Sequence, residues 1–380
     1  MIRHRIKFAV ALTLLALFGM LSVTARPTTA ATELPSQLSD GEFWKLVTEF
    51  SEGGGYFRSD NFVSNETTFQ FVIPELKNTI KPGGVYMGVG PDQNFTYIVA
   101  LEPGISFILD IRRQNMLQHL MYQALIELSE DRAEFLSRLF SRPRPAELGA
   151  GNSAEELFEA FSQVDRSRQL YTDNFDVILK HLKEHHRFEL TPEDEKSLEY
   201  VFNGFYVGGL DLNYNGPANV GLGGRGRMPS YAELMMQTDR EGLNRSYMSS
   251  EETFHVLKEL ERKNLVVPLV GDFAGPKAMR AVGDYLREHS SKVSVFYLSN
   301  VEQYLFQQDD DWSKFFTNVG TLPLASNSTF IRSIFNGLIP PRSTGFGLRS
   351  ASVLSPIDDL LKAFGTGQLR TYYDVIQMSH

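Results

Sequence analysis

The sequence contains no cysteine, and this absence excludes several kinds of site at once. Without thiols the chain can form no disulfide bond, no thiolate metal centre and no cysteine nucleophile. An excess of positive charge is also missing, because 37 lysines and arginines stand against 46 aspartates and glutamates. Proteins that bind DNA or RNA present basic surfaces to the phosphates, so we do not expect nucleic acid as a partner.

Long apolar runs are absent except near the N-terminus. There Arg3, Arg5 and Lys7 precede an uncharged run at residues 8–23, which at about 16 residues is shorter than the roughly 20 that span a bilayer. Small residues suitable for cleavage follow, so we interpret residues 1–30 as a secretory signal peptide. We expect export to the periplasm or the extracellular space, with no membrane span after cleavage. An uncleaved signal anchor is the alternative, and it would also place the rest of the chain outside the cytoplasm.

The mature chain is acidic. Residues 1–30 contain four basic residues and no acidic one, so their removal lowers the formal charge from −9 to −13. An acidic surface keeps a protein soluble and away from anionic membranes. With 42% hydrophobic residues, a mature chain of about 350 residues can bury one large core, and we treat residues 31–380 as a single domain.

The order of elements near the start of this domain indicates the fold class. An apolar strand is predicted at 85–89, followed by a turn and a helix. A second apolar strand at 105–109 ends at Asp110, and apolar residues then recur at helical spacing up to residue 128. This order is typical of a mostly parallel sheet with helices on both faces, so we predict an α/β, Rossmann-like fold.

The strand pattern returns in the second half of the chain. Apolar strands are predicted at 265–270 and 293–298, each followed by a helix. Residues 141–250 show helical periodicity and are interpreted as a helical insertion into the same domain. Residues 330–335 are predicted to be helical, and residues 369–376 to form a terminal strand.

The turn after the first predicted strand is the first candidate for a binding site. Its glycines, Gly88 and Gly90, allow a ligand to approach the backbone, and the N-terminus of the following helix favours an anionic group. Asp110 closes the next strand about 20 residues later, at the position that commonly binds a ribose hydroxyl. Residues 94–96 stand where the third glycine of a dinucleotide fingerprint would be, so a nucleoside-type ligand without a diphosphate is favoured. A purely structural turn is the alternative.

Several of these segments resemble known motifs. Residues 81–90 with 108–110 are similar to the first two motifs of class I S-adenosylmethionine-dependent methyltransferases, and residues 270–272 to a later strand-end motif of that fold. The resemblance implies a Rossmann-like fold and a ligand crevice. We select as candidate cofactor-binding residues Gly88, Gly90, Asp92, Asn94, Asp110 and Asp272.

A closer resemblance covers roughly residues 50–340. It is to an uncharacterised bacterial family, loosely grouped with methyltransferases, whose members often bear signal peptides. The segments that resemble it are 88–94, 107–115, 271–277 and 297–304. This resemblance implies the same Rossmann-like fold and leaves the activity, and whether the chain is an enzyme at all, open.

Two departures from the methyltransferase pattern matter. Pro91 and Asp92 replace the usual small residues after the second glycine, and the catalytic tetrapeptide Asn/Asp-Pro-Pro-Tyr/Phe is missing. Export would also separate the chain from cytosolic S-adenosylmethionine, so the cofactor stays open. Three interpretations remain. We prefer an exported protein of methyltransferase ancestry that binds a small ligand or partner; the others are an active S-adenosylmethionine-dependent methyltransferase and a hydrolase that uses crevice carboxylates.

Other polar groups in the sequence are of types that carry chemistry. Arg112 and Arg113 either clamp an anionic ligand at the crevice or, as we favour, cap a helix and pair with surface acids. His181 and His185 are four residues apart beside His186, a spacing that can bind a metal. A third ligand cannot be assigned, because Glu184 does not form a His-Glu-x-x-His motif. A solvated helix end explains these histidines equally well, so no metal is predicted.

The glycine-dense segment 204–226 leads into two arginines, Arg225 and Arg227. We interpret it as a flexible surface loop, and a lid over the crevice is the alternative. None of Ser64, Ser230 and Ser328 stands in a Gly-x-Ser-x-Gly motif, which forms the strained turn that presents a nucleophilic serine. No serine hydrolase triad is therefore predicted.

Overall fold

The structure is a computed structural model that describes residues 33–217, 228–335 and 350–380. These residues belong to one compact unit, residues 33–380. The predicted signal peptide lies outside the described residues, and so do Arg225 and Arg227. Within the described part of the chain, no helix is long and apolar enough to cross a membrane.

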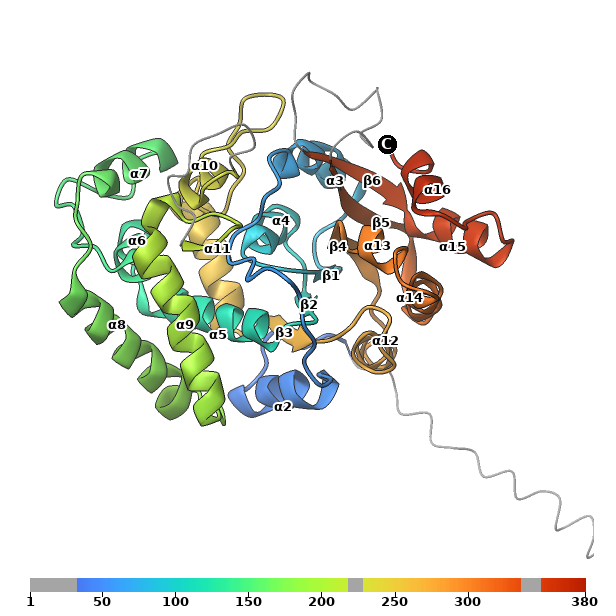
Figure 1. The fold of residues 1–380 in the computed structure, drawn as a ribbon, viewed down its shortest axis with the longest axis horizontal. Helices are drawn as coiled ribbons and strands as arrows, with labels where there is room; N and C mark the ends of the chain where they lie inside the picture. Colours follow the sequence, from blue (N-terminus) through green and yellow to red (C-terminus); the bar gives the residue numbers. More distant parts are fainter. Residues whose placement is uncertain (1–32, 218–227, 336–349) are drawn as a thin grey trace, which may run out of the picture. The chain divides into compact units, whose positions relative to one another are not determined.

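Six strands form a mostly parallel sheet in the order β3-β2-β1-β4-β5-β6 (Figure 1). All neighbouring strands pair in parallel except β5 and β6, which are antiparallel. β1, β2 and β3 are buried along their whole lengths, which is why they appear as continuous apolar runs in the sequence. The strand bounds are β1 (Val85–Gly88), β2 (Ile105–Asp110), β3 (Val266–Val270), β4 (Val293–Ser299), β5 (Leu324–Phe335) and β6 (Ser350–Pro356).

The strand order reverses between β1 and β4, and this reversal places helices on both faces of the sheet. From β1 the chain adds β2 and β3 on one side, then crosses back to add β4 and β5 on the other. Because crossovers between parallel strands are right-handed, helices α4 and α11 cover one face, and α12 and α14 cover the opposite face. The contacts agree, since α4 touches α11 and α12 touches α14.

Helices make up most of the remaining described chain. Helices α5 to α11 all lie in the connection between β2 and β3, within which the predicted insertion at 141–250 falls. α5 contacts both β3 and α9, while α9 contacts α6 and α8, so α5 joins these helices to the sheet (Figure 1). The α-helices are α2 (Asp40–Phe50), α3 (Ile73–Thr79), α4 (Gln93–Leu101), α5 (Arg113–Leu128), α6 (Arg132–Phe140), α7 (Ala154–Ser162), α8 (Arg168–Lys180), α9 (Pro192–Gly208), α10 (Tyr231–Met235), α11 (Glu251–Arg262), α12 (Ala278–Glu288), α13 (Val301–Leu305), α14 (Asp311–Val319), α15 (Ile357–Gly365) and α16 (Tyr372–Gln377). Shorter turns are the 3-10 helices η1 (Phe69–Val72) and η3 (Gly209–Asp211), and the π-helical turn η2 (His181–His185).

The prediction of a helix at residues 330–335 is wrong, because these residues belong to β5. Phe330, Ile331 and Ile334 are spaced as on a helix face, and this spacing suggested the wrong element. β5 pairs with β4 on one side and β6 on the other. β6 was not predicted from the sequence, and the pairing of β5 with β4 joins separate segments. The periodicity within residues 330–335 could therefore not reveal either pairing.

The prediction of a terminal strand at residues 369–376 is also wrong, because α16 occupies this segment. Thr371 accepts a hydrogen bond from the backbone N–H of Asp374, and the Asp374 carboxylate accepts one from the backbone N–H of Thr371. This reciprocal capping box starts a helix. The Thr-x-x-Asp signal is present in the sequence and outweighs the short apolar run.

Candidate functional site

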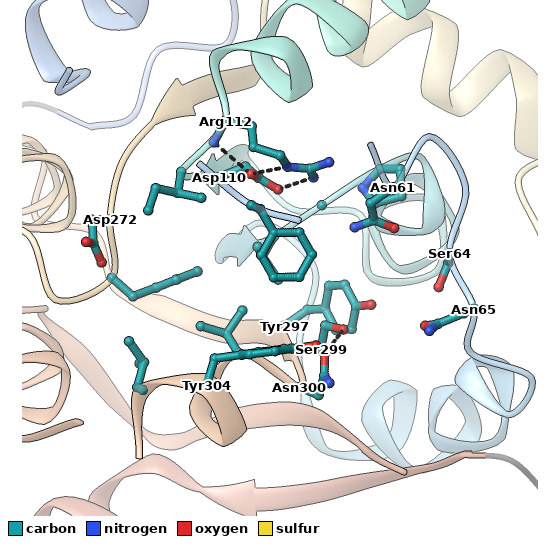
Figure 2. Close-up of a pocket in the computed structure, with 18 of the residues that line it drawn as sticks. Asn61, Ser64, Asn65, Asp110, Arg112, Asp272, Tyr297, Ser299, Asn300 and Tyr304 are labelled. Carbon is teal, nitrogen blue, oxygen red and sulfur yellow. Dashed lines mark hydrogen bonds and ion pairs between the residues drawn. The ribbon is translucent and has the colours of Figure 1, made fainter. Parts of the chain in front are cut away.

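A cavity of about 210 Å³ lies at the carboxyl edge of the sheet (Figure 2). Four neighbouring strands end at it, with Gly90 following β1, Arg112 following β2, Asp272 following β3 and Asn300 following β4. The cavity therefore includes the point between β1 and β4 where the strand order reverses. In open α/β sheets this is the usual place for a ligand crevice.

Aromatic side chains form much of the cavity wall. The rings of Phe57 and Tyr304 meet edge to face, with their centroids 5.4 Å apart. Walls of aromatic rings with a few polar groups are typical of sites for small molecules with a planar ring. The aromatic lining residues are Tyr56, Phe57, Tyr214, Phe273, Tyr297 and Tyr304.

Asp110 and Arg112 form a buried ion pair on one side of the cavity (Figure 2). Oδ1 of Asp110 accepts hydrogen bonds from the backbone N–H and the Nε of Arg112, both at 2.9 Å, and Oδ2 accepts one from Nη2 at 2.7 Å. Burial alone would lower the pKa of Arg112, but the charge of Asp110 and these hydrogen bonds outweigh it and raise the pKa. Arg112 pairs with an acid, as the favoured sequence interpretation has it, but this acid is buried at the cavity and does not lie on the surface.

Arg112 also attaches a loop to the end of β2. Its Nη1 donates to the carbonyl oxygens of Ser59 and Asp60. Its guanidinium lies over the ring of Phe57, 5.8 Å from the centroid. The irregular segment 56–65 thereby closes one side of the cavity.

Asp110 keeps some capacity to bind a ligand despite this pairing. An ionised carboxylate has about four lone-pair positions, and the hydrogen bonds from Arg112 use three of them. One position on Oδ2 remains for a hydroxyl group in the cavity. Asp272 follows the neighbouring strand and lines the same cavity, with its Oδ1 accepting from the backbone N–H of Ala274 at 2.9 Å. Burial raises the pKa of Asp272.

The predicted glycine turn contributes to the cavity through Gly90, which has a φ of 80° and lines it. Gly88 is required for packing, because an added Cβ would lie 1.9 Å from Oδ1 of Asn94. Asn94 is buried and does not line the cavity. Its Nδ2 donates to the carbonyl oxygens of Val89, Gly90 and Pro91, at 3.0, 3.2 and 2.7 Å. Asn94 therefore holds the shape of the turn.

Asp92 faces the protein core. It is 1% exposed, and its Oδ2 accepts a hydrogen bond from the hydroxyl of Tyr247 at 2.8 Å. The hydroxyls of Tyr247 and Tyr231 lie 2.7 Å apart. Burial disfavours the charged carboxylate and raises the pKa of Asp92 to about 7. Its position gives it no contact with the cavity.

Sequence analysis missed a second polar group beneath the cavity. Glu66 is fully buried, and its Oε1 accepts hydrogen bonds from the hydroxyls of Tyr297 and Ser299. Its Oε2 accepts one from Nε2 of Gln93 at 2.7 Å. In the described part of the chain no cation pairs with Glu66, so these neutral donors alone satisfy it.

Ser299, which lines the cavity, has a φ of 50° although it is not glycine. Backbone strain of this kind is common at functional sites. Its only sequence signal is its place at the end of a predicted strand.

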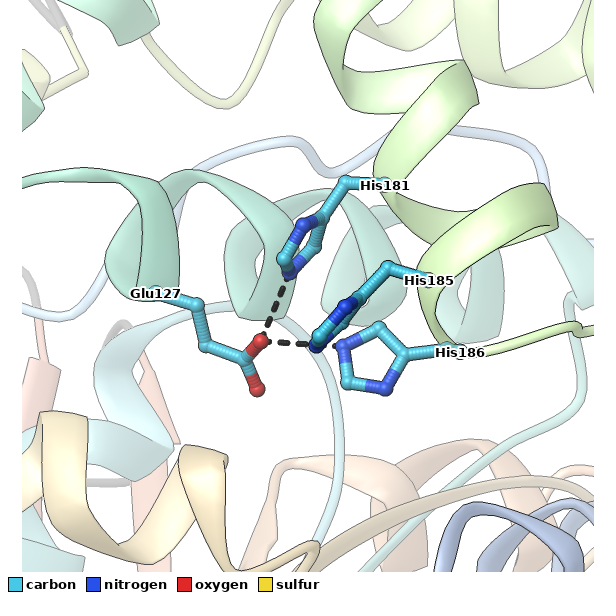
Figure 3. Close-up of side chains that lie close together, drawn as sticks. All are labelled: Glu127, His181, His185 and His186. Atoms are coloured by element: carbon cyan, nitrogen blue, oxygen red, sulfur yellow. Dashed lines mark hydrogen bonds and ion pairs between the residues drawn. The ribbon is translucent and has the colours of Figure 1, made fainter.

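The remaining predicted residues lie elsewhere. Arg113 pairs with Asp194 at the start of α9 through bonds of 2.6 and 2.8 Å. His181, His185 and His186 lie beside the last turn of α5, at the opposite end of that helix from Arg112 (Figure 3).

Comparison with known proteins identifies a family without an assigned function. The family described as Domain of unknown function (DUF7790) matches residues 61–203 and 223–350. No curated protein matches this chain. The matched ranges include Asp110, Arg112, Asp272 and Ser299, so most of the cavity lies within the family's domain. Because the match covers most of the chain, this protein belongs to the DUF7790 family.

Proposed function

We propose that the chain binds a small nucleoside-type ligand, with a planar ring and hydroxyl groups, in the cavity at the carboxyl edge of the sheet. The observation that supports this most directly is the free acceptor position on Asp110 within an aromatic wall. A ribose hydroxyl would donate to Oδ2 of Asp110, and the planar base would stack on the aromatic side chains.

The charges around the cavity favour a ligand without a diphosphate. Arg112 is the one cation among the lining residues that the structure describes, and Asp110 already neutralises it. Pyrophosphate binding needs free cations or a glycine-rich turn at a helix N-terminus. Here the turn is held by Asn94, and Asp92 takes the N-cap position of α4.

The fold supports Rossmann-like, methyltransferase-type ancestry as part of this proposal. The strand order β3-β2-β1-β4-β5-β6 is the usual order of a dinucleotide-binding sheet, with an antiparallel β6 as the departure. We place the chain, as predicted from residues 1–30, outside the cytoplasm. A ligand there would be a nucleoside or related metabolite taken from the surroundings, which needs binding and no group transfer.

Calorimetric titration of the mature chain tests the proposal. Adenosine, S-adenosylhomocysteine, S-adenosylmethionine and NAD are titrated separately into residues 31–380. We expect saturable heat with adenosine or its thioether derivatives and weaker binding of NAD, because no unpaired cation is among the described residues that line the cavity and could hold its diphosphate. Absence of heat with every nucleoside at millimolar concentration would reject the proposal.

A second candidate function is hydrolysis, and one observation favours it. The Ser299 hydroxyl donates to the buried carboxylate of Glu66, and the strained backbone presents Ser299 at the end of β4. A carboxylate in this position can accept the serine proton as the oxygen attacks an acyl carbon. A fluorophosphonate probe should then label the wild type and not Ser299→Ala. Failure to label the wild type would reject this second function.

A further inference from the structure

Four side chains that could bind a metal come together away from the cavity (Figure 3). Glu127 lies in the last turn of α5, His181 and His185 belong to the π-helical turn η2, and His186 follows it. One ligand atom from each residue lies within 4.8 Å of all the others. Glu127 is distant in sequence from the histidines, so sequence analysis did not find it, and the neighbouring Glu184 is not part of this cluster.

The Glu127 carboxylate occupies the centre of this cluster. Its Oε2 lies 2.7 Å from Nε2 of His181 and 2.9 Å from Nε2 of His186. Its Oε1 is buried and has no hydrogen-bond partner among the residues that the structure describes, and the side chain is only 7% exposed. Buried polar atoms in native proteins almost always have a partner, so an unpaired carboxylate oxygen among imidazoles is a position that a cation would satisfy.

The π-helical turn explains how His186 joins the other two histidines. The backbone N–H of His186 donates to the carbonyl of His181, five residues earlier, at 3.1 Å. In an α-helix, residues five apart are rotated by about 140° from each other, so His181 and His186 would diverge. The wider turn brings both to the side that faces Glu127. Single π-helical turns are rare and occur frequently at functional sites.

Further contacts fix the ring of His186. Its Nδ1 lies 2.8 Å from Oδ1 of Asp40, which also accepts a hydrogen bond from Nδ2 of Asn264 at 2.9 Å. The ring stacks on Phe188, with centroids 4.9 Å apart and an interplanar angle of 11°. A carboxylate on one ring nitrogen sets the tautomer and leaves the lone pair of the other nitrogen, Nε2, directed at a metal.

We propose that Glu127, His181, His185 and His186 bind one Zn²⁺ ion. Three imidazole nitrogens and one carboxylate oxygen are ligands that zinc accepts, and four protein ligands complete a tetrahedron. With ligands about 2.1 Å from the metal, tetrahedral ligand atoms lie about 3.4 Å apart. The 2.7 and 2.9 Å separations at Glu127 need to open only slightly, and exposed His185 can turn inward.

A zinc site with four protein ligands has a structural role, because it leaves no position for substrate. It would join the end of α5 to the end of α8 directly and to α2 through Asp40. Glu127 lies 14 residues along α5 from Arg113, or about 21 Å. The site is therefore separate from the cavity, and its test is independent of the proposed ligand.

The experiment uses the mature chain after treatment with a chelator. Calorimetric titration with ZnCl₂ should show one saturable site per chain, and MgCl₂ should give no heat, because Mg²⁺ prefers oxygen ligands. Co²⁺ in the same site should give the intense visible absorption of a tetrahedral complex. No saturable Zn²⁺ binding would overturn the proposal.

Matched variants assign the site to these residues. His185→Ala changes an exposed side chain, and Glu127→Gln keeps a hydrogen-bonding group in place, so both variants should fold. Each should weaken Zn²⁺ binding at least ten- to a hundredfold, the range already typical of losing an outer contact to a metal ligand. His255→Ala, an exposed histidine on α11 outside the cluster, should bind like the wild type. Wild-type affinity in both cluster variants, or an equal loss in His255→Ala, would contradict the assignment.

Discussion

The hydroxyl of Tyr247 donates a hydrogen bond to the buried carboxylate of Asp92, 155 residues earlier in the chain. This contact joins the start of α4 to the chain that leads into α11. No cation among the described residues compensates the charge of Asp92, and burial raises its pKa to about 7 although the hydrogen bond from Tyr247 lowers it. Folding stability therefore depends on pH through this carboxyl group.

Asp92→Asn should remove part of that dependence. Below pH 3.8 the group is protonated in both the folded and the unfolded chain. Between pH 3.8 and about 7 only the unfolded chain loses the proton, so stability falls as pH rises through this window and then stays constant. A difference of about three pKa units corresponds to about 4 kcal/mol. Urea unfolding should therefore show Asp92→Asn gaining up to that amount over the wild type between pH 4 and pH 8.

The exposed Asp309 offers a matched control, since Asp309→Asn removes the same charge without burial. Its free energy of unfolding relative to the wild type should stay flat over the same pH range. A flat profile for Asp92→Asn as well would show that Asp92 is ionised in the folded protein at pH 5.

Asp110→Asn should destabilise the fold as well as weaken ligand binding. The substitution leaves the buried guanidinium of Arg112 without a counter-charge, which typically costs about 3–5 kcal/mol. Lys45→Ala breaks the ion pair with Glu49, in which the two side chains are 67% and 61% exposed, and should cost about 1 kcal/mol or less. Chemical denaturation of both variants measures the difference. Equal losses would mean that burial of the Asp110–Arg112 pair has no energetic effect.

Gly88→Ala and Gly90→Ala should differ because only one glycine is tightly packed. A Cβ at Gly88 would lie 1.9 Å from Oδ1 of Asn94 and force that side chain out of the turn, at a cost of about 3 kcal/mol. At Gly90 the nearest atom would be 3.7 Å away, so only the strain of a positive φ remains, about 1–2 kcal/mol. Thermal unfolding of the two variants gives the comparison. A stable Gly88→Ala would disprove the structural role of Asn94.

Tyr56→Ala separates ligand binding from stability. Tyr56 is 85% exposed, so loss of its ring should leave the free energy of unfolding unchanged. Loss of a stacking ring typically costs about 1–3 kcal/mol, and adenosine affinity should fall about tenfold or more. Calorimetry and urea unfolding on one preparation measure both quantities. Unchanged affinity would place the base elsewhere in the cavity.

The sequence predicted those strands that appear in it as short, continuous apolar runs. β1 and β2 are buried on both faces, so each appears as an apolar run. Asp110 and Asp272 each stand at the end of a predicted apolar strand in the sequence. Parallel strands end at the same edge of a sheet, and both aspartates line the cavity at that edge. Their role in ligand binding stays a prediction.

Contacts between segments that are distant in sequence could not be predicted from local residue patterns. Glu66 lies 231 residues from Tyr297 in sequence, and Glu127 lies 54 residues from His181. Neither glutamate sits in a motif, so only the folded arrangement shows its partners. The pairing of Asp110 with Arg112 involves neighbours, yet the sequence could not show that the pair is buried. Burial depends on the loop at 56–65, which has no periodic signal.

Helix α5 has one end at the cavity and the other at Glu127, and its residues 115–126 are buried without interruption. A helix enclosed on all sides can expose its central amides to solvent only when the core around it opens. Amide hydrogen exchange at these residues would therefore measure the free energy of opening the core rather than the fraying of one helix.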